Sequence, residues 1–187
     1  MSTRLNRHFS LFVCDLQRKI IDKTCNKDIT KHINFLLQSS HKFKNFNNRH
    51  IAKFKPQYFG SIHGLDNDLI DTNNVVTKET YTMLSDNILN NLNDNKITDV
   101  VLTGIETQWC ITHTSLDLLD NKFKVHIPID AVSSQSKVQH DIAIQRLISL
   151  GCHPCTSLSI VSEMLKGVDE EETKWYVEYY KTIMKDN

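Results

Sequence analysis

The sequence predicts an α/β fold: a single-domain, three-layer α/β/α sandwich around a mostly parallel, Rossmann-like sheet of about six strands. Short apolar runs alternate with helical patterns along the chain. The apolar runs are continuous, which is typical of strands buried on both faces. The length of 187 residues, 40% of them hydrophobic, suits one domain with a full core.

The first half of the chain contains two predicted strands and one predicted helix. The run FSLFVC at Phe9–Cys14 predicts a buried strand, and Arg49–Phe54 is a weaker strand candidate. Between them, Asp28–Leu37 has apolar residues at helical spacing, with Asp28 as a candidate N-cap. Lys55–Asn74 loses any period and contains Pro and Gly, which predicts a long surface loop. Loops of that length in compact domains are commonly functional.

Strands and helices alternate more regularly in the second half of the chain. A strand followed by a helix, repeated, implies parallel strands with helices on both faces. Gly151 closes one of the helices. The predicted strands are Val75–Thr77, Thr98–Thr103, Lys124–Ile129 and Cys152–Thr156, and the predicted helices are Tyr81–Leu92, Thr107–Leu119, Lys137–Leu150 and Leu158–Leu165.

The C-terminal tail predicts one more helix. Aromatic residues at i, i+1, i+4 and i+5 form a helical stripe between about residues 169 and 185. We expect this helix to pack on its own domain, and it is also a candidate for part of a subunit interface. The whole chain, 1–187, is expected to be one domain with a core at about 9–165.

Charge and cysteine content exclude several classes of protein. The 22 basic and 22 acidic side chains balance, so no strong field attracts nucleic acid or an anionic membrane. The sequence predicts neither a secretory signal nor a membrane span. The 5 cysteines are an odd number, which fits reduced thiols in a cytoplasmic compartment better than a disulfide framework.

Chemically useful residues follow several of the predicted strands. The residues found at predicted strand ends are Asp15, Lys78, the segment Gly104–Cys110 and Asp130. In open parallel sheets these ends share one edge, where ligands bind. A carboxylate, an ammonium and a thiol there form the set required for a base-assisted cysteine nucleophile.

Cys110 lies in the predicted first turn of a helix. Free N–H groups and the helix dipole there favour the thiolate. Taken singly, the three residues also have simpler interpretations. Cys110 could be a packing residue, Asp15 a turn cap and Lys78 a solvated loop residue.

Three segments resemble the isochorismatase-like cysteine hydrolases. Val101–Cys110 (VLTGIETQWC) is similar to their nucleophile segment. Leu11–Gln17 (LFVCDLQ) looks like their first strand, and Thr77–Met83 (TKETYTM) is similar to their lysine segment. The resemblance runs from about Phe9 to Leu165 and is closest to the isochorismatase domain-containing branch.

The resemblance implies a hydrolase that acts on a small amide or a related carbonyl compound through a covalent thio-intermediate. Cys110 would attack the carbonyl carbon, and Asp15 would serve as general base and then acid. Lys78 would hold the Asp15 carboxylate and favour charged groups nearby. The alternative is a catalytically silent isochorismatase-like protein that binds or scaffolds.

Further site residues follow from the same resemblance. The bond between Ile105 and Glu106 would be cis, and the backbone N–H groups of Glu106 and Cys110 would form the oxyanion hole. Gln17 and Trp109 are candidate substrate-binding residues. Beyond a small-molecule substrate, the expected partner is a second copy of the chain, because family members are commonly oligomeric.

Metal sites are disfavoured by the sequence. Nicotinamidases, which the chain resembles, bind zinc through an Asp-x-His pair and a further histidine. His63 lies in the long loop without that spacing, so no metal and no cofactor is expected. Cys152-His153-Pro154-Cys155 leaves open a redox or zinc role. An isolated pair on a late strand is weak support for it.

Overall fold

A seven-stranded sheet forms the centre of the computed structural model, which describes residue 5 and residues 8–43, 48–70, 75–165 and 170–184. Its order is β3-β2-β1-β4-β5-β7, with β6 paired to β4, and the described pairs are parallel. The strands are β1 (Phe9–Cys14), β2 (Arg49–Phe54), β3 (Val75–Lys78), β4 (Asp99–Ile105), β5 (Lys124–Pro128), β6 (Val132–Ser133) and β7 (His153–Cys155). The α/β class is confirmed.

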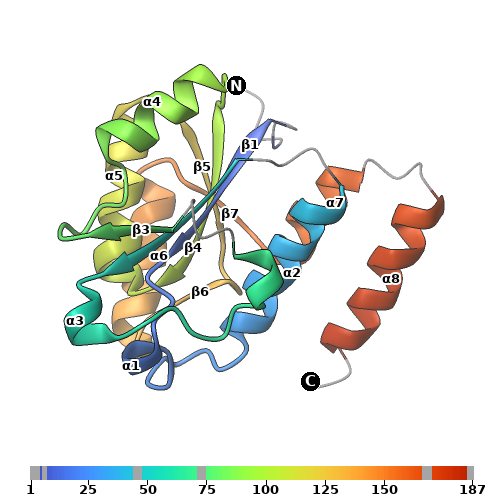
Figure 1. Cartoon of the computed structure of the whole chain (residues 1–187), viewed down its shortest axis with the longest axis horizontal. Coiled ribbons are helices and arrows are strands. Elements are labelled where there is room, and N and C mark those ends of the chain that lie inside the picture. Colours follow the sequence, from blue (N-terminus) through green and yellow to red (C-terminus); the bar gives the residue numbers. More distant parts are fainter. Residues whose placement is uncertain (1–4, 6–7, 44–47, 71–74, 166–169, 185–187) are drawn as a thin grey trace.

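Helices cover both faces of this sheet (Figure 1). On one face are α2 (Ile29–Lys42), α7 (Ser157–Leu165) and α8 (Glu170–Met184); on the other are α4 (Asp86–Asp94), α5 (Thr112–Asp120) and α6 (Lys137–Ser149). Short turns fill the connections: α1 (Arg18–Ile21), α3 (Pro56–Phe59), the 3₁₀ turn η1 (Asn67–Leu69) and the π-helical turn η3 (Thr107–Ile111). Among the described residues, no helix is long and apolar enough to cross a membrane.

The central strand β1 is buried on both sides. Leu11 and Val13 belong to the apolar cluster that includes residues of α2 and α7. Phe12 and Cys14 belong to the cluster on the opposite face, with residues of α4, α5 and α6. Because side chains alternate along a strand, a continuous apolar run is what a strand between two helical layers requires.

Several predicted elements have shifted boundaries; α2, for example, continues to Lys42, beyond the predicted end at Leu37. The helix predicted at Tyr81–Leu92 begins only at Asp86, where the Ser85 side chain caps it by accepting from the Ile88 N–H. The predicted loop Lys55–Asn74 contains α3 and η1, while its last four residues lie outside the described ones. The two-residue strand β6 was not predicted, because so short a run has no recognisable period.

The tail helix α8 packs on its own domain, as expected. The rings of Tyr179 and Phe35 stack with their centroids 4.6 Å apart, and Trp175 meets Phe43 edge-on at 5.3 Å. The hydroxyl of Tyr176 donates to a carbonyl of α7, Leu158 O, at 3.3 Å. The aromatic stripe therefore covers α2 and α7.

Gly104 allows β4 to lie close to β1. Its φ is +125°, and a Cβ built there would lie 2.0 Å from the carbonyl oxygen of Cys14, which is its partner in the β1–β4 register. No side chain fits that gap, so the end of β4 requires glycine.

We expect Gly104→Ala to destabilise the fold severely. Backbone strain at positive φ costs about 1–3 kcal/mol, and overpacking against backbone adds about 1–3 kcal/mol. Urea unfolding measures the loss. Gly151→Ala is the matched control, since Gly151 has φ +102° but nothing within 4 Å of an added Cβ. Equal losses for the two variants would contradict the steric argument.

Candidate active site

Three strand ends bring the predicted catalytic side chains together. Asp15 follows β1, Lys78 ends β3, and Cys110 lies in η3, just after β4. Lys78 Nζ lies 2.7 Å from Asp15 Oδ2 and 3.3 Å from Cys110 Sγ. All three residues are buried, with 2%, 7% and 4% of Asp15, Lys78 and Cys110 exposed. The structure thus places the predicted carboxylate, ammonium and thiol in direct contact.

Lys78 is held in place by its surroundings. Its Nζ also donates to the carbonyl oxygens of Thr80 and Tyr81, at 3.1 and 3.0 Å. The ring of Phe54, at the end of β2, lies 4.7 Å from Nζ in a cation–π contact. Burial lowers the pKa of Lys78, but the negative charges that Cys14, Asp15 and Cys110 can carry, with the Asp15 hydrogen bond, outweigh it and raise the pKa overall. Lys78 is therefore a fixed cation at neutral pH.

Asp15 presents one oxygen to Lys78 and leaves the other unpaired. Oδ2 accepts from Lys78 and from Cys14 Sγ, the latter at 3.3 Å. Oδ1 is buried and has no hydrogen-bond partner among the described residues. The backbone of Asp15 has φ +57°, a strained conformation that the surrounding structure must hold. An unpaired buried acceptor is suited to receive a proton from the thiol or from a substrate.

Cys14 is a site residue that the sequence reasoning did not identify. The ligand atoms of Cys14, Asp15 and Cys110 all lie within 4.8 Å of one another. Burial, a hydrogen bond with Cys110 and the charge of Asp15 raise the pKa of Cys14 well above its usual value. Cys14 therefore stays a thiol, whereas the sulfur of Cys110 accepts a hydrogen bond from Lys78 Nζ. The sequence signal that could have identified Cys14 was its position directly before Asp15.

The segment carrying Cys110 begins as a wide π-helical turn rather than the expected α-helix. η3 covers Thr107–Ile111 before α5 starts. Such turns are often found at functional sites. Next to the buried sulfur, Trp109 is 50% exposed and stacks on Tyr81 at a centroid distance of 6.3 Å. An exposed aromatic pair is therefore formed by Tyr81 and Trp109, the residue directly before the buried Cys110.

The expected cis bond before Glu106 is wrong. The described peptide bonds are all trans, and Glu106 instead adopts φ +65°. Its N–H donates to Ser133 O at 2.8 Å, because β6 pairs with the end of β4 at Ile105 and Ser133. Because this N–H is bonded within the sheet, it is not free to serve in the oxyanion hole, the role expected of Glu106. The Glu106 carboxylate accepts from the side chains of Gln108 and Gln135.

Gln17 has a structural position. Its Nε2 donates to Gly60 O at 2.6 Å, and its Oε1 accepts from the Phe54 N–H at 2.8 Å. The side chain is fully buried. Both ends of the amide thus tie the end of β1 to the end of β2 and to the following loop, whereas Trp109 remains open to a substrate.

Asp130 does not join the other strand-end residues. Its carboxylate accepts from the backbone N–H and the hydroxyl of Ser157, at 2.8 and 2.7 Å, and so anchors the start of α7. Asp130 is therefore a structural residue that holds the start of α7, although the sequence places it at a strand end like Asp15.

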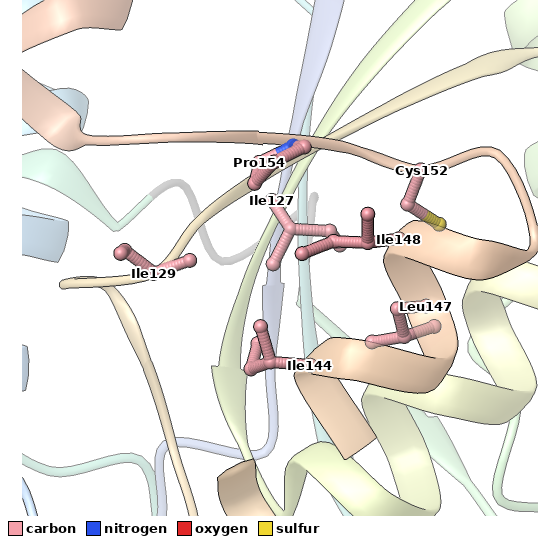
Figure 2. Close-up of a pocket in the computed structure, with 7 residues that line it drawn as sticks. All are labelled: Ile127, Ile129, Ile144, Leu147, Ile148, Cys152 and Pro154. Atoms are coloured by element: carbon pink, nitrogen blue, oxygen red, sulfur yellow. The ribbon is translucent and has the colours of Figure 1, made fainter. Parts of the chain in front are cut away.

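The Cys-x-x-Cys pair is divided between the two faces of the sheet. Cys152 belongs to the apolar cluster on the α5–α6 side, and Cys155 packs against the cluster on the α2–α7 side. Figure 2 shows Cys152 beside Leu147 and Ile148 in a small apolar pocket. Burial raises the pKa of Cys152 to about 11. The geometry opposes a shared metal or redox role.

The histidine site of the nicotinamidases has no counterpart here. His63 is exposed, and its backbone N–H donates to Leu16 O. Within the described ranges, one group of three His, Cys, Asp or Glu residues has its ligand atoms close together, and it is Cys14, Asp15 and Cys110. It contains no histidine, and the Lys78 ammonium already contacts two of its members. These residues do not fit that zinc site.

The isochorismatase domain model matches residues 10–159. The chain belongs to the isochorismatase family. It is 30% identical over 173 residues to isochorismatase family protein 1A of Dictyostelium discoideum, covering 88% of this chain and 82% of the relative. The family resemblance of the three motifs is thereby confirmed.

Solved structures of other proteins share the fold. The Caenorhabditis elegans structure described as MAR1 ribonuclease has a TM-score of 0.80 and 25% identity, with 95% of this chain and 92% of that chain covered. The Escherichia coli YcaC protein, described as an octameric hydrolase of unknown specificity, has a TM-score of 0.80 at 14% identity, covering 100% of this chain and 97% of that one.

We predict that Gln17→Leu lowers the free energy of unfolding by about 1–3 kcal/mol, because it leaves the Phe54 N–H and the Gly60 carbonyl without partners. Trp109→Ala should cost no more than about 1.5 kcal/mol, the value of an aromatic pair. Urea titrations of the two variants make the comparison. A Gln17 variant as stable as the native chain would restore this residue to the substrate-binding candidates.

Proposed function

We propose that this isochorismatase-family chain is a cysteine-dependent hydrolase that cleaves the C–N bond of a small amide or a related carbonyl compound. The observation that supports this most directly is the contact of Lys78 Nζ with both Asp15 Oδ2 and Cys110 Sγ in a buried site. A carboxylate, an ammonium and a thiol are the three groups that a base-assisted thiol attack requires. The 5 thiols, free in this structure, suit the reducing cytoplasm.

The proposed reaction has two steps. Asp15 takes the proton of Cys110, whose sulfur attacks the carbonyl carbon, and then gives that proton to the leaving amine as the C–N bond breaks. A thioester on Cys110 remains. Water deprotonated by Asp15 then attacks the thioester, releasing the carboxylic acid and restoring the thiol. Lys78 stays charged throughout and stabilises Asp15 and the thiolate.

The oxyanion that forms on the carbonyl needs donors. We assign the N–H of Cys110, at the start of the helical segment, to this role. The N–H of Glu106 reaches it only if the bond to Ser133 O opens. This one observation favours the alternative, a protein that binds carbonyl compounds without turning them over. Trp109, exposed beside the nucleophile, is the proposed substrate contact.

The substrate should be small. Cys110 is 4% exposed, and Trp109 and Tyr81 lie on the surface beside it. Long polymers do not reach a thiol at that depth without a large rearrangement. For this reason, and because the chain has no net charge, we do not extend the ribonuclease description of the C. elegans relative to this chain. We do propose self-association, as described for the YcaC octamer.

Alkylation tests the activated thiol. With iodoacetamide at neutral pH, in a Cys25→Ser background that removes the exposed thiol, Cys110 should label first. Cys152 should label slowly because burial raises its pKa to about 11, and Cys155 because burial and the charges of Asp130 and Glu163 raise its pKa. Peptide mass mapping over time gives the order. If Cys152 or Cys155 labels faster than Cys110, the thiol is not activated.

A hydrolysis screen tests the reaction. Native protein incubated with a panel of small amides and a short RNA should release amine from at least one amide, and Cys110→Ala should abolish it. Asp15→Asn should lower kcat by about 10²–10⁴-fold, the usual contribution of a general base. Cys152→Ala, a buried cysteine outside the site, is the matched control and should retain activity.

The outcomes separate the hypotheses. Amide hydrolysis that persists in Cys110→Ala removes the nucleophile assignment. Binding of an amide with no release by native protein supports the silent alternative. RNA cleavage that depends on Cys110 would replace the proposed substrate class.

A further inference from the structure

We propose that Cys110 is an oxidation site and that Cys14 is its resolving thiol, so that a hydroperoxide converts the pair to an intramolecular disulfide. The proposal goes beyond the hydrolase function and rests on it in one respect, the reactivity of the Cys110 sulfur. Cys14 is otherwise an unexplained choice, because a buried strand position facing an apolar cluster needs only an apolar side chain.

Distance supports the pairing. The sulfur atoms of Cys14 and Cys110 lie within 4.8 Å of each other, on the same face of the sheet. An S–S bond is about 2.05 Å long, so rotation of the two side chains and a small shift of η3 must close the remaining gap. The other described cysteines do not belong to this group: Cys152 directly precedes β7, Cys155 ends it, and Cys25 is exposed near Ser133.

The site also supplies the required proton transfers. In the first step the Cys110 thiolate attacks the peroxide, the O–O bond breaks, and Cys110 becomes a sulfenic acid as hydroxide or an alkoxide leaves and takes up the proton that Cys110 lost. In the second step the Cys14 sulfur attacks the sulfenic sulfur and the S–O bond breaks. The proton of Cys14 passes to Asp15 Oδ2, which already accepts from that thiol at 3.3 Å, and from there to the departing hydroxide as water. Two thiols are oxidised and one peroxide is reduced.

The neighbours distinguish the roles of the two thiols. Lys78 Nζ contacts Cys110 Sγ at 3.3 Å, and a cation beside the sulfur is typical of cysteines that react with peroxide. Cys14 is held protonated by burial and by its position beside Asp15, which raise its pKa, so it does not compete for the oxidant. The disulfide would protect Cys110 from irreversible oxidation and would stop hydrolysis until a thiol reductant restores both groups.

The test treats the full native chain with hydrogen peroxide and maps peptides without reduction. We expect a Cys14–Cys110 cross-linked peptide that dithiothreitol removes. In Cys14→Ser, which keeps a hydrogen-bond donor beside Asp15, the same treatment should leave Cys110 as sulfinic or sulfonic acid that dithiothreitol does not reverse. Cys155→Ser is the control and should form the cross-link normally.

Two results overturn the proposal. Native protein whose Cys110 reaches the sulfinic acid with Cys14 still free shows that Cys14 does not resolve it. A disulfide that joins Cys110 to Cys25 instead assigns the role to another thiol. Iodoacetamide separates these failures from failure of the proposed function: rapid alkylation of Cys110 without the cross-link rejects only the resolving role, and slow alkylation rejects the activated nucleophile as well.

Discussion

The buried contact between Lys78 and Asp15 is the constraint on which the site depends. Two charges removed from water cost several kcal/mol each, and only close pairing with further hydrogen bonds offsets this. Here the offset comes from a 2.7 Å ion pair, two backbone carbonyls and an aromatic ring. Loss of either partner would leave an unpaired buried charge, a change that typically costs 3–5 kcal/mol. The same ammonium also contacts the sulfur of Cys110, at 3.3 Å.

The sheet order explains why strained backbone accompanies this pair. β2 lies between β1 and β3, so Lys78 must reach past the end of β2 to meet Asp15. Asp15, Lys55 and Glu106, which follow the neighbouring strands β1, β2 and β4, all have positive φ. Such residues each cost about 1–3 kcal/mol and persist where the surrounding structure holds them. The strands thus turn sharply at one edge, and this turn gathers the side chains there.

Much of this arrangement is predictable from sequence, for reasons that differ by residue. The run Phe9–Cys14 predicts β1 because both of its faces are buried, and Asp15 and Lys78 come at strand ends that any parallel sheet brings to one edge. The cis bond before Glu106 was wrong because pairing with Ser133 depends on β6, a strand of two residues. The spacing of apolar residues in Tyr81–Ser85 predicts a helix. In the structure, however, the carbonyls of Thr80 and Tyr81 accept hydrogen bonds from Lys78. Contacts between distant segments determined those outcomes.

The same segment that fixes Lys78 also contacts the residue next to Cys110. Tyr81 gives its carbonyl to the ammonium while its ring stacks on Trp109, the residue before Cys110. Movement of the backbone at Tyr81 would loosen the Lys78 ammonium, whereas movement of the ring alone would change the exposed aromatic pair and leave that cation in place. The position of Lys78 and the arrangement of this aromatic pair are therefore coupled through one residue.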